Sequence, residues 1–199
     1  MPFLQLVLFL LLALSTSAAA DTFEGTCQIR FFGDSTLHSF EGRGDCQPFS
    51  LADEQVGAAP QIAASEIEVQ VAGLDTDNSS RDKKMREMFD SENFPLIIAR
   101  FRELDSEELL ASWQSFPQGE LAFDLSIRGL IRPVTATVRN LTVSEQSIDL
   151  TLEFTLSLEN FALEAPGVLG IIRVDDLVKV EVDTQLKRTS QGPVAAEAQ

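Results

Sequence analysis

The chain has 199 residues and a formal net charge of −16, because 31 Asp and Glu residues outnumber 15 Lys and Arg residues. A surface this acidic repels phosphate backbones, which argues against nucleic-acid partners and for a soluble exported protein. The length suits one packed domain, and the single histidine, His38, excludes a multi-histidine metal site.

The N-terminal segment has the pattern of a secretory signal. Residues 3–14 are apolar except for Gln5, and small residues at 15–20 precede the first charge, at Asp21. This run is too short for a good membrane span, so a signal over residues 1–20 is favoured over a retained anchor. No second long apolar stretch follows, and we expect a periplasmic or secreted mature chain without a transmembrane segment.

Two cysteines, Cys27 and Cys46, lie on either side of the turn-like residues 33–36. In a hairpin they would sit opposite each other, and an oxidising compartment favours a disulfide over free thiols. Closing a loop of this size would contribute about 3 kcal/mol.

Alternation of apolar and polar residues with a period of two dominates the rest of the chain. The clearest case is residues 148–158, in which Ile, Leu and Phe alternate with Asp, Thr, Glu and Ser. The remaining strands are expected at 23–32, 39–49, 66–71, 96–104, 121–128, 133–143 and 178–183. About eight one-sided antiparallel strands predict an all-β domain, and a closed barrel is favoured over a sandwich because one helix is too little to cover an open sheet.

That helix is predicted from Ser80 to Asp90, with Ser79 and Asp82 as its capping pair. Its spacing gives one apolar stripe, made of Met85, Met88 and Phe89, and places four cations mostly on the other side: Arg81, Lys83, Lys84 and Arg86. Two interpretations stay open for these cations, a solvated basic face or contacts with a ligand head group.

The C-terminal segment, residues 188–199, has no periodicity and is expected to be disordered. The folded domain is therefore expected over residues 21–187, with no internal repeat and no second domain.

Five short motifs, taken in order, resemble one known family. They are STLHSFEG at 35–42, DTDN at 75–78, RDKKMR at 81–86, FP at 94–95 and IRGLIRPV at 127–134. The chain resembles the YceI-like family of exported lipid-binding proteins over roughly residues 22–187. The resemblance implies an extended, lipocalin-like, eight-stranded antiparallel β-barrel with one short helix near its mouth, whose apolar pore holds a long-chain isoprenoid, a quinone-like lipid or a similar amphiphile.

Composition agrees with such a ligand, because 14 Phe and no Tyr offer contact area with few hydrogen-bond donors. An ordinary Phe-rich core that fills the barrel, in a structural or interaction domain without a ligand, is the alternative. The expected ligand-binding residues are Ile29, Phe31, Val69, Val71, Met85, Met88, Phe89, Ile97, Phe101, Phe123, Phe154 and Val180.

No enzymatic activity is expected. His38 lies on a turn beside Ser35 and Ser39, where hydrogen bonds within the loop explain it more simply than hydrolysis or metal binding does. The resemblance calls for no cofactor or metal beyond the lipid, and a homodimer is left open.

Overall fold

One curled antiparallel sheet makes up most of the molecule. The computed structural model describes residues 21–36, 38–56, 59–115, 119–165 and 174–189. The expected signal sequence at 1–20 and most of the expected tail lie outside these residues. The strands are β1 (Asp21–Gly33), β2 (Phe40–Asp45), β3 (Phe49–Val56), β4 (Ala59–Ile62), β5 (Ser65–Gln70), β6 (Leu96–Phe101), β7 (Leu104–Asp105), β8 (Gly119–Ile127), β9 (Leu130–Val143), β10 (Ser147–Ser157) and β11 (Leu177–Thr189).

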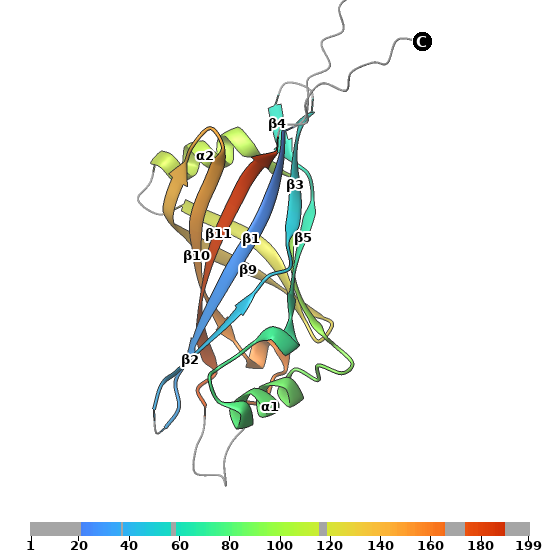
Figure 1. The fold of residues 1–199 in the computed structure, drawn as a ribbon, viewed down its shortest axis with the longest axis vertical. Coiled ribbons are helices and arrows are strands. Elements are labelled where there is room, and N and C mark those ends of the chain that lie inside the picture. Colours follow the sequence, from blue (N-terminus) through green and yellow to red (C-terminus); the bar gives the residue numbers. More distant parts are fainter. Residues whose placement is uncertain (1–20, 37, 57–58, 116–118, 166–173, 190–199) are drawn as a thin grey trace, which may run out of the picture.

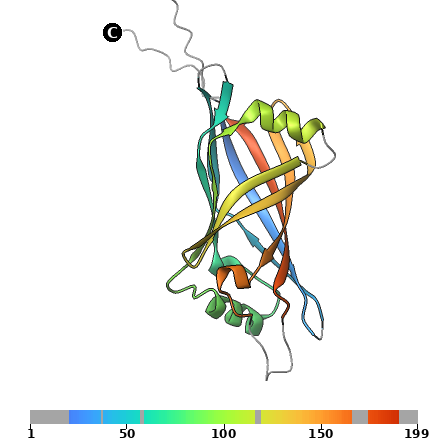
Figure 2. The ribbon, with the colours of Figure 1, turned by 180° about the vertical axis from the view of Figure 1, so that it is seen from behind.

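In the described part of the chain, four helical segments accompany the sheet: η1 (Val71–Gly73), α1 (Ser79–Met88), α2 (Ser106–Ser115) and η2 (Glu159–Phe161). The two α-helices lie at opposite ends of the elongated barrel (Figure 1), and the view from behind in Figure 2 shows the same arrangement. None of the helices in the described part of the chain is long and apolar enough to cross a membrane.

The strands follow the order β5-β6-β8-β9-β10-β11-β1-β3-β4-β7, and β2 pairs with β1. The two sides of the curled sheet meet at a seam made of single contacts. Gln47 N donates to Glu68 O at 2.8 Å, Arg43 N donates to Asp75 O at 2.8 Å, and Cys46 forms an isolated bridge with Val69. These contacts close the antiparallel β-barrel, so the expected fold class is confirmed.

About eight strands were expected, and the structure contains each of them with some differences in bounds and number. The expected strand 39–49 ends with β2 at Asp45, before Pro48, which has no N–H to donate to a ladder, and the strand that follows, β3, was not expected. The short strands β4 and β7 also pair with each other and extend the α2 end of the sheet. β11 runs to Thr189, two residues beyond the expected domain boundary, and pairs Arg188 with Phe23 of β1.

The β8–β9 hairpin shows how local sequence fixes the register. Arg128 and Gly129 both have left-handed φ angles, of 49° and 75°. Two such residues form the tight turn that matches strand twist, and Gly adopts this conformation without a steric cost. The turn pairs Ile127 with Leu130 and turns Leu121, Phe123, Leu125 and Ile127 toward the interior, where all four side chains are buried.

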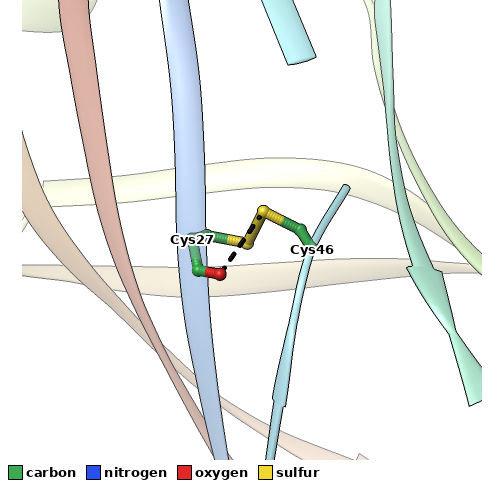
Figure 3. The surroundings of a disulfide bond; sticks show 2 residues. All are labelled: Cys27 and Cys46. Atoms are coloured by element: carbon green, nitrogen blue, oxygen red, sulfur yellow. Dashed lines mark hydrogen bonds between the residues drawn. A yellow bond between two sulfur atoms is a disulfide. The ribbon is translucent and has the colours of Figure 1, made fainter. Parts of the chain in front are cut away.

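A disulfide joins Cys27 to Cys46, with Cα atoms 5.3 Å apart, and Figure 3 shows it linking β1 to the chain just after β2. The two residues continue the β1–β2 register, because Cys46 N donates to Cys27 O at 3.1 Å. The expected pairing across a hairpin is therefore confirmed. Because Cys46 also bridges to Val69, the disulfide fastens the sheet where its two sides meet.

We expect the unfolded, unreduced protein to contain no thiol that reacts with a chromogenic disulfide reagent. Both cysteines are consumed by the single Cys27–Cys46 bond, and no free cysteine remains. The same titration after reduction serves as the control and should find both thiols. Two reactive thiols before reduction would contradict the pairing.

Candidate ligand-binding cavity

A partly open cavity of about 440 Å³ lies inside the barrel. Its wall is formed by side chains from seven strands, β1, β2, β5, β6, β8, β10 and β11, and α1 lies against one end. On β11 the lining residues run from Val178 to Thr184, which at ~3.3 Å per residue span roughly 20 Å. A lined length of this size suits a chain-like ligand.

The deep part of the cavity is almost wholly apolar. Strand alternation supplies this lining, because every second residue of a barrel strand points inward. The apolar residues that line it are Ile29, Phe31, Ile67, Val69, Ile97, Ala99, Phe101, Phe123, Leu125, Ile127, Leu152, Phe154, Leu156, Leu158, Val178, Val180 and Val182.

Three phenyl rings from neighbouring parts of the wall lie together in this space. The Phe101 and Phe123 ring centroids are 5.2 Å apart and tilted by 32°, and Phe154 meets Phe123 edge to face at 5.6 Å. Such packing fixes the rings and leaves their remaining surfaces toward the cavity. They form a bare hydrocarbon wall without hydrogen-bond donors.

Polar side chains line the cavity mainly at the α1 end. They come from the β1–β2 connection, from the segment before α1 and from α1 itself: Ser35, His38, Thr76, Asn78, Ser80, Arg81 and Lys84. The cavity thus has an apolar interior and one polar mouth, an arrangement that matches an amphiphile.

The start of α1 is set by Asn78, whose side-chain Oδ1 accepts from the N–H groups of Ser80 and Arg81 at 3.1 Å each. Asn is among the preferred residues at this capping position. The expected capping pair of Ser79 and Asp82 was wrong, because the Asp82 carboxylate turns inward instead. The helix ends at Met88, two residues before the expected end.

One face of α1 lines the mouth. Positions 81, 84, 85 and 88 are three or four residues apart and therefore lie on the same side of the helix. This side carries Met85 and Met88 of the expected apolar stripe, and Phe89 follows them at the helix end. The expectation that the cations lie mostly on the opposite side was wrong for Arg81 and Lys84, which also line the cavity.

Arg81 is held in place by a buried cluster. Its Nε donates to Thr76 Oγ1 at 2.9 Å, and its Nη2 donates to the Thr76 carbonyl at 2.6 Å. Asp82 Oδ1 accepts from the backbone N–H and the hydroxyl of the same threonine, at 2.9 and 2.6 Å. The guanidinium lies 4.7 Å from the centroid of the Phe40 ring. These contacts use two of the five Arg81 N–H groups and leave three for a ligand.

Lys84 differs from its neighbour Lys83. The Lys83 side chain is 76% exposed and lies 3.9 Å from Glu87, one turn along the helix. Lys84 is half-buried, lines the mouth, and has no hydrogen bond or ion pair with any described residue. An unpaired ammonium at an apolar cavity is unexpected in a chain with twice as many acids as bases, so Lys84 is the cation best placed to meet a ligand.

The segment that leads into α1 is tied to β2 by charge. Arg43 Nη2 contacts Asp75 Oδ2 at 2.9 Å and Asp77 Oδ1 at 2.6 Å. The hydrogen bonds that the Arg43 guanidinium donates to these two carboxylates raise its pKa. The pKa of Asp75 is lowered, first by the backbone N–H of Asp77 and then by Arg43. The ionised Asp75 side chain therefore helps to hold the mouth segment, and this contribution is lost as pH falls through the lowered pKa. The two backbone hydrogen bonds between Arg43 and Asp75 do not depend on that ionisation.

Of the twelve expected ligand-binding residues, eleven line the cavity and Val71 does not. β5 ends at Gln70 and the chain turns into η1, so the alternation that points Ile67 and Val69 inward stops there. Val71 is only 1% exposed and packs in the core outside the lining. Among the four expected head-group cations, Arg81 and Lys84 line the mouth, whereas Lys83 and Arg86 lie outside it.

Several lining residues were absent from the expected set. Leu152 and Leu156 flank Phe154 on the same strand face, and Val178 and Val182 flank Val180, so the alternation itself could have found them. Thr76 and Phe40 carry no comparable signal, because their positions depend on contacts with α1. Within the described residues, no three His, Cys, Asp or Glu side chains are grouped so that they could hold a metal ion.

The fold and the cavity together define a small lipocalin-like β-barrel with an apolar interior and a polar mouth. The sequence model of the YceI-like domain family matches residues 22–186, and the chain belongs to this family. The expected recognition is therefore confirmed.

Solved structures share the fold at low sequence identity. The crystal structure of Burkholderia cenocepacia BcnA is 13% identical over 80% of this chain and 95% of that chain, with a TM-score of 0.60. A polyisoprenoid-binding domain from Saccharophagus degradans, implicated in plant cell wall breakdown, is 13% identical over 86% and 99%, with a TM-score of 0.56. The Campylobacter jejuni YceI protein is 12% identical over 75% and 85%, with a TM-score of 0.51. No curated protein matches the chain.

Proposed function

We propose that this protein is an exported carrier that holds a long-chain isoprenoid, or a similar amphiphilic lipid, inside its barrel. The observation that carries the proposal is the cavity of about 440 Å³, which is apolar along its length and polar at one end. Its size lies in the ordinary range of ligand pockets. The name of the Saccharophagus degradans domain supports an isoprenoid as the class of ligand.

The main alternative is a barrel filled by its own side chains, which would act only as a structural or interaction domain. A filled barrel of eight strands leaves no such space, because its inward side chains occupy the interior. The cavity volume therefore favours the carrier. Affinity would come from buried apolar area, at roughly 25 cal/mol per Å² before the costs of ordering the ligand.

We further propose that Arg81 and Lys84 contact the head group of the ligand. Arg81 is fixed by Thr76 and retains free N–H groups, and Lys84 has no protein partner in the described part of the chain. A phosphate or another anionic group of the ligand at the mouth would provide the negative partner that Lys84 lacks. Charge-assisted hydrogen bonds of this kind are about twice as strong as neutral ones.

Organic extraction of the purified protein followed by mass spectrometry tests the carrier. We expect a co-purified long-chain isoprenoid, or uptake of one from solution by protein that was first delipidated. The same extraction of protein denatured before purification controls for lipid that adheres nonspecifically. A protein that is ligand-free and takes up no lipid in vitro would reject the proposal.

The carrier performs no covalent chemistry, and His38 provides the test. This residue is exposed at the mouth and lies in a turn in which Ser35 Oγ donates to the His38 carbonyl at 2.7 Å. That bond uses the backbone, so we expect His38→Ala to change lipid affinity by less than about twofold. Fluorescence titration with a labelled isoprenoid measures this effect. Complete loss of binding in a folded variant would assign a direct role to the imidazole.

Export fits the same proposal. The signal-like residues 1–20 and the disulfide both indicate an oxidising compartment, either the periplasm or the cell exterior. A water-insoluble ligand in such a compartment needs a protein that shields its chain.

A further inference from the structure

The inward face of β2 carries glycines where other strands of the wall carry apolar side chains. The exposed residues Glu41, Arg43 and Asp45 alternate along this strand with the buried Gly42 and Gly44. Neither glycine has a positive φ angle, so the backbone at both positions is open to any residue. A glycine inside a strand often marks the close approach of another group.

The group that approaches Gly42 is the ring of Phe31, its directly paired residue on β1. A Cβ atom on Gly42 would stand closer than 3.0 Å to three atoms of that ring, a separation that real Cβ atoms essentially never show. The Phe31 ring therefore occupies the space that a side chain of residue 42 would need. The ring lines the cavity, and Gly42, which it covers, does not.

Two more glycines of the β1–β2 hairpin make room for a lining side chain in the same way. A Cβ on Gly33 would stand closer than 3.0 Å to the Phe40 ring, and a Cβ on Gly44 would stand equally close to Leu74. Phe40 and Leu74 both line the cavity. The hairpin thus lets apolar side chains lie closer to its backbone than a wall with its own side chains would allow, and this widens the cavity.

The Phe31 ring has only one open direction in which to move. One cross-strand row contains Gly42 on β2, Phe31 on β1, Val180 on β11 and Phe154 on β10. Val180 is 8% exposed and occupies the side of the ring opposite Gly42. A group larger than hydrogen at position 42 would therefore push the ring into the cavity. Small and large residues alternate along the row, as they do inside small barrels, and the free width at this row depends on the glycine.

We propose that Gly42 sets the cross-section of the chain that the barrel accepts, and that the width it leaves selects methyl-branched chains over straight ones. This inference rests on the proposed carrier function and names a residue that gives the carrier its specificity. A cavity wide enough for methyl branches leaves voids beside a straight alkyl chain, and atoms that line a void lose van der Waals contacts. One methylene group in an apolar pocket changes affinity by about 10- to 200-fold, so a single branch that no longer fits beside Phe31 would be enough to alter the preference.

Competition between two saturated alcohols tests this selection. Phytanol and hexadecanol have the same main chain and the same hydroxyl group, and they differ only in the methyl branches. Delipidated protein is incubated with an equimolar mixture, and the bound alcohols are extracted and quantified by mass spectrometry. We expect the unaltered protein to bind more phytanol than hexadecanol, and we expect Gly42→Ala to lower the ratio of bound phytanol to bound hexadecanol at least tenfold.

Gly25→Ala is the matched control. Gly25 makes room for the ring of its own paired residue, Phe49, in the same manner, but Phe49 does not line the cavity. Each of the two substitutions therefore displaces one phenyl ring, and we expect Gly25→Ala to leave the ratio within twofold. The double variant Gly42→Ala/Phe31→Leu removes the displaced ring and should return the ratio to within threefold of the unaltered value.

The ratio and the folding of the variants decide the outcome. The selection would be overturned if the unaltered protein binds both alcohols equally, if Gly42→Ala leaves the ratio unchanged, if Gly25→Ala lowers it as much, or if Phe31→Leu fails to restore it. A Gly42→Ala protein that does not fold while Gly25→Ala folds would also overturn it, because the ring would then have no space to enter. Binding of neither alcohol by the unaltered protein would instead reject the carrier, and the selection with it.

Discussion

Replacing Phe154 with Trp is expected to weaken the binding of a long isoprenoid by about a hundredfold while the barrel remains folded. The Phe154 ring already meets Phe123 at 5.6 Å inside the cavity, and the larger indole would project into the open space. If the ligand loses about 100 Å² of buried apolar surface, the cost is about 2.5 kcal/mol at ~25 cal/mol per Å². That free energy corresponds to a change in Kd of nearly two orders of magnitude. Fluorescence titration and thermal unfolding measure the two effects.

Phe161→Trp is the matched control for this substitution. Phe161 is 2% exposed and packs in η2 outside the cavity lining, so there is no space to receive a larger ring. Overpacking at such a site typically costs 1–3 kcal/mol of stability. We therefore expect Phe161→Trp to lower the unfolding temperature and Phe154→Trp to lower affinity instead. Equal destabilisation by both variants would mean that the phenyl cluster is an ordinary core, as in the filled-barrel alternative.

The contrast between these two phenylalanines shows what the sequence could predict. Phe154 lies on the strand with the clearest alternation, so its inward direction followed from the period-two pattern alone. The same pattern predicted the inward faces of β5, β8 and β11. It could not tell whether the enclosed space is empty, because that depends on the curvature of the sheet and on side chains from opposite walls.

The predictions from the sequence were wrong or missing where the periodicity of apolar residues no longer determines the structure. Val71 continues the alternation of Ile67 and Val69 in the sequence, and its backbone N–H still extends the β5–β6 pairing by donating to the Pro95 carbonyl, but η1 begins at this residue and the chain turns away from the wall. The helix α2 was missed altogether. Its apolar residues Leu109, Leu110 and Trp113 are too few for a clear helical period, and its position is fixed by packing, including the Trp113 indole N–H that donates to Glu120 O at 3.1 Å.

The mouth was predictable only in part, because it combines elements distant in sequence. The four cations of α1 are adjacent in the chain and look alike, and the helical period divides them into two pairs once the inward face is known. Arg81 lies on that face because Asn78 starts the helix and Thr76 holds the guanidinium. Neither contact has a sequence signature, because Asn78 and Thr76 would look the same in a solvated loop. The inward pair, Arg81 and Lys84, can nevertheless be tested for contact with a head group, and the outward pair, Lys83 and Arg86, serves as the control.

Reversing the charges of the two inward cations, Arg81→Glu/Lys84→Glu, is expected to weaken an anionic isoprenoid by about a hundredfold and a neutral one by less than about threefold. Each cation would contribute about 1.5 kcal/mol through a charge-assisted hydrogen bond, so the loss for the anionic ligand is about 3 kcal/mol. An isoprenyl phosphate and the matching isoprenyl alcohol are the two ligands to titrate. The difference between them should grow from 0.1 M to 0.01 M salt, because the screening length rises from about 10 Å to about 30 Å.

The outward pair provides the control, since Lys83→Glu/Arg86→Glu changes the net charge of the protein by the same amount. Lys83 is paired with Glu87 on the outer face and neither residue lines the cavity, so only the long-range field changes. We expect this variant to bind the phosphate at most about threefold more weakly at 0.1 M salt, because exposed charges at that distance are largely screened. Arg81 also holds Thr76, so its replacement could disturb the mouth as well as remove a charge. The single variant Lys84→Glu changes only the charge, and we expect it alone to weaken the binding of the phosphate about tenfold. Equal losses for the phosphate and the alcohol, or equal losses from the inward and outward pairs, would reject a head-group contact and assign α1 a purely structural role at the end of the barrel.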